Sequence, residues 1–80
     1  MKVFYLEGKN VFSNVNVEGV VDSNVDDIKI IQYIESKYEI KYNFDYDKRF
    51  NHHHIYSFIK DDIKDFDCKL HIVIVDQIHI

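Results

Sequence analysis

Three consecutive histidines, His52 to His54, are the first residues in this sequence that could do chemistry. In a strand, alternate side chains point the same way about 6.6 Å apart, so His52 and His54 could offer two imidazoles to one metal ion. Zinc needs a third protein ligand, and only pairing between distant strands could bring His71, His79 or Asp76 to this pair. The sequence therefore predicts no metal site and no cofactor, and His52 and His54 are the residues to test first for metal.

The residues that could supply a nucleophile are Cys68 and Ser57. If Cys68 and His71 lie in one strand, their odd spacing sends the two side chains to opposite faces, so the imidazole cannot take the thiol proton. Cys68 shares its parity with Leu70 and Ile72, which predicts a small core residue. Ser57 has neither an acidic residue to orient a histidine nor a glycine-built oxyanion turn. We expect a protein that is not an enzyme.

Carboxylates occur in pairs at Asp26 and Asp27, at Asp45 and Asp47, and at Asp61 and Asp62. A hydrolase needs two such groups at a fixed separation inside a cleft. These pairs instead fall at predicted capping, strand-face and loop positions that face solvent. The acidic stretch 61–67 lacks the glycine and terminal glutamate of a calcium loop, and the two glycines of the chain are too isolated to cradle a phosphate.

Composition and periodicity predict the elements that position these residues. The 80 residues are 46% hydrophobic, with no Pro, no Trp and two Gly, which is typical of one globular, strand-rich domain over residues 1–80. A single cysteine permits no internal disulfide. Met1 is followed at once by a predicted strand with no signal-peptide pattern, and no apolar run approaches the roughly 18 residues of a membrane span. We expect a cytoplasmic protein, in the host cytoplasm if a phage encodes it.

Two strands and a helix are predicted in the first half. Alternation predicts strands over Lys2–Glu7, covered on both faces, and over Val11–Val21, joined as a hairpin by a turn at residues 8–10. Ser23 or Asn24 is predicted to cap a helix of about 15 residues, with an aspartate three positions later in capping-box position. The apolar side of this helix, expected to pack on the sheet, consists of Ile28, Ile30, Ile31, Ile34 and Tyr38.

Three further strands are predicted in the second half. Apolar and polar residues alternate over 40–46, and Asp47–Asn51 is predicted to be a polar turn. A second strand is expected over His52–Lys60, a loop over Asp61–Asp67, and a third strand over Cys68–Ile80. The fold class is therefore two-layer α+β, in the order ββαβββ, with one amphipathic helix on an antiparallel sheet.

The C-terminal segment Cys68–Ile80 is apolar on both faces and has no Lys or Pro after Leu70 to protect an edge. It is therefore either a central strand or a strand that pairs with another chain. Asp76 interrupts its apolar face and indicates a bulge, an edge or a frayed end.

Charge favours a protein partner. Fourteen acidic residues against ten Lys and Arg give a net charge of −4, which disfavours direct binding to nucleic-acid phosphates. A larger protein with a basic surface is the more natural partner, and no membrane partner is expected. Acidic clusters with nearby tyrosines suit such a contact. The residues predicted to bind the partner are Asp61, Asp62, Asp65, Asp67, Asp45, Asp47, Tyr33 and Tyr46.

We therefore predict a small acidic protein-binding module. Its residue bias fits AT-rich codons, which favours a phage or mobile-element protein that inhibits a host protein by occupying a basic or nucleic-acid-binding surface, in the manner of anti-CRISPR proteins. One alternative is a homodimeric structural or assembly protein that associates through sheet edges, because so small a domain gains stability from a partner. A further alternative is a metal-binding protein that uses His52 and His54.

Overall fold

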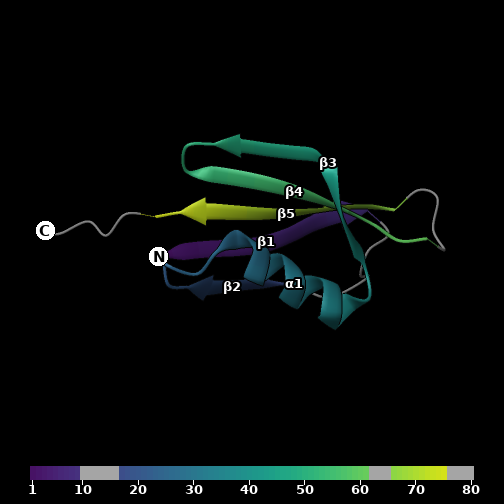
Figure 1. The fold of residues 1–80 in the computed structure, drawn as a ribbon, viewed down its shortest axis with the longest axis horizontal. Helices are drawn as coiled ribbons and strands as arrows, with labels where there is room; N and C mark the ends of the chain where they lie inside the picture. Colours follow the sequence, from purple (N-terminus) through teal and green to yellow (C-terminus); the bar gives the residue numbers. More distant parts are fainter. Residues whose placement is uncertain (10–16, 62–65, 76–80) are drawn as a thin grey trace, which may run out of the picture.

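The computed structural model describes residues 1–9, 17–61 and 66–75. Within these ranges the chain forms a five-stranded antiparallel sheet with one helix against one face (Figure 1). The predicted order ββαβββ and the two-layer α+β class are confirmed. The elements are β1 (Lys2–Lys9), β2 (Glu18–Val21), α1 (Asp27–Tyr38), β3 (Lys41–Phe50), β4 (His53–Ile59) and β5 (Asp67–Ile74).

The strands lie in the order β2-β1-β5-β4-β3, so the last of the described strands is the central one. This confirms one of the two positions predicted for the C-terminal segment, as far as Ile74; the bulge or edge expected at Asp76 lies outside the described residues. Hydrogen bonding to β5 carries β1 through Gly8 and Lys9, which pair with Cys68 and Asp67. The turn predicted to begin at Gly8 is therefore wrong for these two residues, because a long partner strand extends the pairing.

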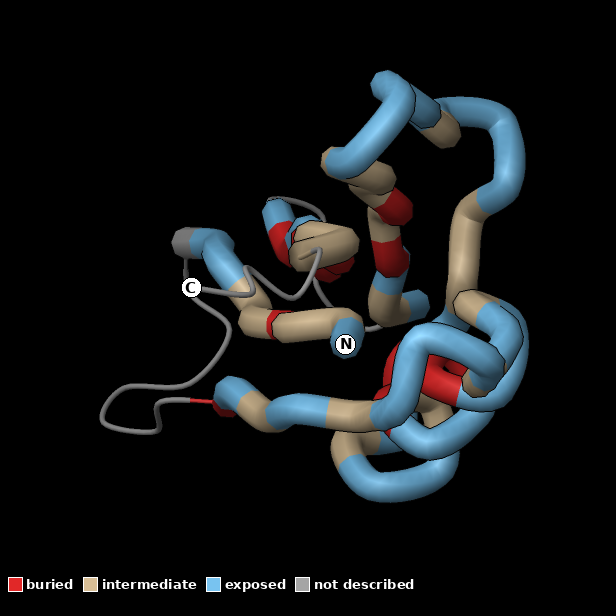
Figure 2. Tube along the Cα trace, turned by 90° about the vertical axis from the view of Figure 1, so that its left-hand side faces the viewer, coloured by how far each residue is buried: buried red, intermediate tan, exposed pale blue. Residues whose placement is uncertain are grey.

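The core lies between α1 and the sheet (Figure 2). The helix buries Ile30, Ile31 and Ile34, as its periodicity predicts, and it ends where Glu39 adopts a left-handed conformation with φ 55°. Ile28 is 48% exposed and does not belong to the packed side as predicted, because its angle on the helical wheel places it at the margin of the buried stripe. The sheet contributes buried side chains from Phe4, Tyr56, Phe58, Cys68, Leu70 and Ile72.

The helix begins later than predicted. The amide of Val25 donates to the carbonyl of Asp22 at 3.1 Å, so Ser23 and Asn24 occupy the centre of a β-turn and cap nothing. The N-cap is Asp26, whose side chain makes no capping hydrogen bond, and the first helical residue is Asp27. The start is set by tertiary contacts of Asp27, which are described below.

Strand β3 differs most from its prediction. Residues 47–50, expected in a turn, continue the strand, and the turn is confined to Asn51 and His52. Asn43 pairs with Ser57 and Lys48 with Ile55, so four residues of β3 lie opposite the single residue between those partners. A three-residue bulge follows from this register, and it breaks the alternation that the sequence suggested.

The two faces of the sheet differ. The helix covers the face that carries Phe4 and Leu6, and the described residues place no second layer over Val3 and Tyr5 on the opposite face of β1. The prediction that β1 is covered on both faces therefore holds for one face in this part of the chain. No helix in the described ranges is long and apolar enough to cross a membrane.

Candidate protein-binding surface

The bulge of β3 carries the most exposed aromatic side chains in the described chain. Phe44 is 73% exposed and Tyr46 is 66% exposed. Between them, the amide of Asp45 donates to Asn43 Oδ1 at 3.3 Å, which is the hydrogen bond of a local Asx turn. We call Phe44, Asp45 and Tyr46 the bulge triad. Because β3 is an edge strand, the triad projects from the rim of the sheet.

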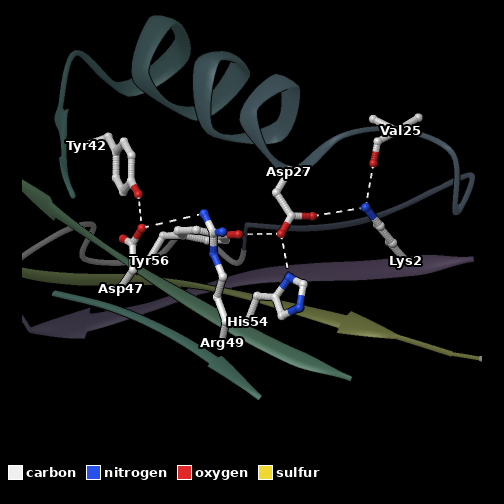
Figure 3. Close-up of polar contacts among 8 residues, drawn as sticks. All are labelled: Lys2, Val25, Asp27, Tyr42, Asp47, Arg49, His54 and Tyr56. Carbon is white, nitrogen blue, oxygen red and sulfur yellow. Dashed lines mark hydrogen bonds and ion pairs between the residues drawn. The ribbon is translucent and has the colours of Figure 1, made fainter. Parts of the chain in front are cut away.

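The base of the bulge is anchored on the helix side of the sheet (Figure 3). Tyr42 donates a hydrogen bond to Asp47 Oδ2, and Arg49 lies 3.8 Å from the same oxygen. The Arg49 guanidinium stacks 5.6 Å above the ring of Tyr56, and Tyr42 meets that ring edge-on with centroids 5.7 Å apart. Burial, together with the bond to Asp47, raises the pKa of Tyr42 to about 12, so its hydroxyl remains a donor at neutral pH. These contacts fix the two ends of the triad.

The described residues among those predicted to bind a partner lie in different surroundings. Asp45 and Tyr46 lie in the triad, but Asp47 is half-buried at its base and accepts a hydrogen bond from Tyr42, so its carboxylate does not face solvent as the sequence suggested. Asp61 is exposed beside Lys41 at 3.7 Å, and Asp67 begins β5. Asp62 and Asp65 lie outside the described residues.

Tyr33 lies on a different side of the molecule. It is half-exposed on α1, where Lys37 donates to its hydroxyl at 2.9 Å. It also lines a groove of about 380 Å³ between the helix and β2, together with Phe4, Val25 and Ile30. Since β2 and β3 are opposite edges of the sheet, Tyr33 and the bulge triad do not form one contact surface.

A buried polar cluster holds the start of α1 on the sheet. Asp27 Oδ2 accepts hydrogen bonds from Tyr56 and, at 2.6 Å, from His54 Nδ1; its Oδ1 accepts one from Lys2 Nζ at 3.0 Å. Lys2 also donates to the carbonyl of Val25 at 2.7 Å. Burial raises the pKa of Asp27, but the bonds from Tyr56, His54 and Lys2 outweigh it and leave the pKa below its usual value. The cluster therefore holds an ionised carboxylate between helix and sheet (Figure 3).

Sequence reasoning treated Asp27 only as a capping residue. The one local signal that pointed to this cluster was the shared parity of His54 and Tyr56, which places two polar groups on the helix-covered face. Tyr56 is almost completely buried, and burial with the bond to Asp27 raises its pKa. An inaccessible, protonated phenol suits a structural role and no acid–base reaction.

The histidine run is divided among three environments. His52 lies in the exposed turn and His54 binds Asp27, so the two histidines named as residues to test for metal lie in different environments. On the sheet face opposite α1, His53 Nε2 lies 2.9 Å from His71 Nδ1, so one ring donates a hydrogen bond to the other. Over the described ranges, no group of three or more His, Cys, Asp or Glu residues is placed to hold a metal ion.

His71 is buried although the described residues place no helix over it. It stacks on Tyr5 with ring centroids 4.6 Å apart, and it is only 8% exposed. Its Nε2 has no hydrogen-bond partner in the described structure; the carboxylate of Glu7 lies 3.5 Å away, within ion-pair range but without the geometry of a hydrogen bond. Burial lowers the pKa of His71, although Glu7 acts in the opposite direction.

Cys68 is a core residue, as predicted. It is 1% exposed on the helix-covered face and lies opposite Phe58, whereas His71 is on the other face. Burial raises the pKa of its thiol to about 12, so it is not a nucleophile at neutral pH. The geometry confirms that Cys68 and His71 do not form a dyad.

Comparison of the chain with protein-family models, with curated proteins and with solved structures finds no match. Three features of this chain bear on its function: the bulge triad on β3, the polar cluster around Asp27, and the sheet face opposite α1. Of these, the triad carries the two most exposed aromatic side chains of the described residues, on an anchored backbone.

Proposed function

We propose that this protein is a non-enzymatic protein-binding module whose main contact is the bulge triad. The observation that carries this proposal is the exposure of Phe44 and Tyr46 at 73% and 66% on three residues that loop out of an edge strand. Aromatic side chains dominate binding hot spots, and adjacent exposed aromatics in a small domain mark an interaction surface.

The anchored base supports the same proposal. Ordering a loop at an interface opposes binding, so a loop that is already fixed binds more tightly for the same contacts. Strand β3 is fixed just before the triad by Tyr42 and on the C-terminal side of the triad by Asp47 and Arg49. The aromatic pair is thus presented in a preformed arrangement.

Charge supports a basic partner. Asp45 lies between the two aromatic side chains, and the chain carries a net charge of −4. Such a field accelerates association with a positively charged surface and suppresses association with an acidic one. We propose a larger protein with a basic surface as partner; inhibition of a nucleic-acid-binding host protein, as a phage or mobile element would require, is the narrower form of this proposal.

Affinity capture followed by titration tests the proposal. Wild-type protein should capture a stoichiometric partner at low salt, and the double variant Phe44→Ala/Tyr46→Ala should bind that purified partner at least about 30-fold more weakly, as expected for the loss of a hot spot worth about 2 kcal/mol. Asp45→Lys should slow association more than it speeds dissociation. The measurement is surface plasmon resonance.

Tyr33→Ala is the matched control, because it removes an exposed aromatic ring from the opposite side of the molecule. It should bind the partner as wild type does. Equal binding by the double variant, or a loss of binding in Tyr33→Ala alone, would overturn the assignment of the triad. A competition experiment, in which this protein and nucleic acid compete for the captured partner, then tests the narrower inhibitory role.

The described sheet edges give little support to the alternative of association through strand edges. Strand β2 has only four residues, and β3 is interrupted by its bulge. Short and bulged edges are the devices by which sheets prevent edge-to-edge pairing. The sheet face opposite α1 is a separate surface and is considered below.

A further inference from the structure

The sheet face opposite α1, which we call the open face, is organised in rows that cross the strands. Strand pairing fixes each row, because partners in a ladder point to the same side. The first row consists of Val20, Val3, Val73, His53 and Phe50. The second consists of Glu18, Tyr5, His71, Ile55 and Lys48.

The first row is largely apolar. Val20 and Phe50 at its two ends are each 61% exposed, and Val3 and Val73 between them are half-buried. The aromatic rings of Tyr5 and His71 stack beside this row. A largely apolar band across five strands is the kind of surface that a second sheet covers in a β-sandwich.

In the second row and in the row beside it that begins at Glu7, charges are divided between the two halves of the open face. Glu18 on β2 and Glu7 on β1 place carboxylates on one side, and Lys48 on β3 places an ammonium group on the other. Glu18 and Lys48 stand at opposite ends of the same row. Lys69 lies on the central strand, directly across from Glu7.

This arrangement is complementary to itself. A two-fold axis parallel to the central strand β5 places β2 of one copy over β3 of the other, and β1 over β4. Glu18 of each copy then faces Lys48 of the other, and the apolar rows lie over one another. Lys69 lies close to its counterpart near the axis, where the neighbouring Glu7 of each copy offsets the repulsion.

From these observations we infer that two copies of this chain associate face to face through their open faces and form a two-fold symmetric β-sandwich. A third row, which consists of Glu7, Lys69, Ser57 and Asn43, lies beside the second. Five strands about 4.8 Å apart and three rows about 6.8 Å apart give a contact of roughly 20 Å by 20 Å. With side-chain relief, both copies together bury on the order of 1,000 Å², which is the lower limit for a specific interface. The inference is independent of the bulge triad, which lies outside this face.

Reversing the charge at Glu18 or at Lys48, in separate variants, provides the sharpest test. Glu18→Lys gives a face with two lysines in that row, and Lys48→Glu gives one with two glutamates. Each variant alone should dimerise at least tenfold more weakly than wild type, whereas an equimolar mixture should form a heterodimer at least as tight as the wild-type homodimer. Both residues are exposed, so the variants should fold. Sedimentation velocity and native mass spectrometry measure the species present.

Two apolar variants locate the contact. Val20→Glu and Phe50→Glu lie at opposite edges of the open face, so both should weaken the dimer; an interface at a single sheet edge would be affected by only one of them. Phe44→Glu is the control, because it lies in the bulge triad and should leave the dimer intact while it weakens partner binding.

A wild-type chain that sediments as a monomer at about 100 µM would overturn the inference. So would charge variants that each dimerise as wild type does, or a mixture that forms no heterodimer. Because none of these measurements involves the partner of the bulge triad, failure of the dimer and failure of the proposed function are distinguishable.

Discussion

At the scale of single residues, the Asp27 side chain connects the start of α1 to two strands of the sheet. One carboxylate accepts hydrogen bonds from Lys2 on β1 and from His54 and Tyr56 on β4. Truncating it would leave a buried phenol and a largely buried ammonium group without their acceptor. Unpaired buried groups destabilise a protein more than the net gain from their hydrogen bonds suggests.

We therefore expect Asp27→Ala to lower the free energy of unfolding by about 3 kcal/mol. Urea unfolding followed by circular dichroism measures the change. Asp26→Ala is the control one residue away, because the Asp26 side chain makes no capping bond, and its effect should stay within about 0.5 kcal/mol. Equal effects of the two substitutions would contradict the role given to Asp27.

His71 gives a pH dependence with a definite sign. Burial lowers its pKa in the folded chain below the ordinary value of 6.5, so the unfolded chain takes up a proton first as pH falls. Stability from this residue is present above about pH 6.5 and is lost as pH falls toward the folded-state pKa. The groups that face it are Tyr5 and Glu7 on β1, His53 on β4 and Lys69 on its own strand.

The expected outcome is a lower urea midpoint at pH 5 than at pH 7. His71→Gln, which cannot titrate, should flatten this dependence. His52→Gln is the matched control, since His52 lies in the exposed turn, and it should retain the wild-type slope. A His71→Gln protein with an unchanged slope would show that other groups cause the dependence.

At the scale of elements, the short strand β2 depends on close packing against β1. Gly19 lies opposite Phe4, and a Cβ at position 19 would fall 2.5 Å from the ring of Phe4. The benzyl ring therefore fills the space that a side chain on β2 would need. This contact belongs to the β1–β2 pair and explains a glycine within a strand.

Gly19→Ala should destabilise the protein by about 1–3 kcal/mol, because the buried ring must move. Thermal and urea unfolding both report this change. Phe4→Leu combined with Gly19→Ala should cost less than the sum of the two single substitutions, since the smaller side chain relieves the clash. Strict additivity in this double-mutant cycle would argue that the clash is absent.

Strand β3 shows how an element can be recognised and yet misread. Alternation over residues 40–46 correctly indicated a strand, but it implied one continuous apolar face. The ladder instead resumes at Lys48 after a bulge, and this leaves Phe44 and Tyr46 in solvent. Local alternation cannot reveal a bulge. A residue belongs to a bulge only because it has no partner on the neighbouring strand, and that depends on the register between the two strands.

At the scale of the whole molecule, the two proposed contacts lie on different surfaces. The bulge triad projects from one rim of the sheet, and the open face lies opposite the helix. In the two-fold arrangement, β3 of one copy lies over β2 of the other, so the two triads stand at opposite rims of the dimer. Such a dimer would present two binding sites, and linked sites gain avidity when a partner can engage both.

The sequence by itself determined the order ββαβββ, the packed side of the helix around Ile30, Ile31 and Ile34, and the burial of Cys68. Each of these follows from the period of a single segment, since side-chain direction repeats every two residues in a strand and every 3.6 in a helix. Composition and net charge also favoured binding over catalysis.

Only the tertiary structure decided which residues meet. The Asp27 cluster joins Lys2, Asp27 and Tyr56 across 54 positions of chain, and the rows of the open face cross five strands that are not consecutive in sequence. Strand order and register depend on pairing between distant segments, and a shift of one residue would exchange the two faces. For this reason Asp45, Asp47 and Asp61, which charge alone placed in one predicted contact surface, have different surroundings. The bulge triad and the open face could be identified only from the fold.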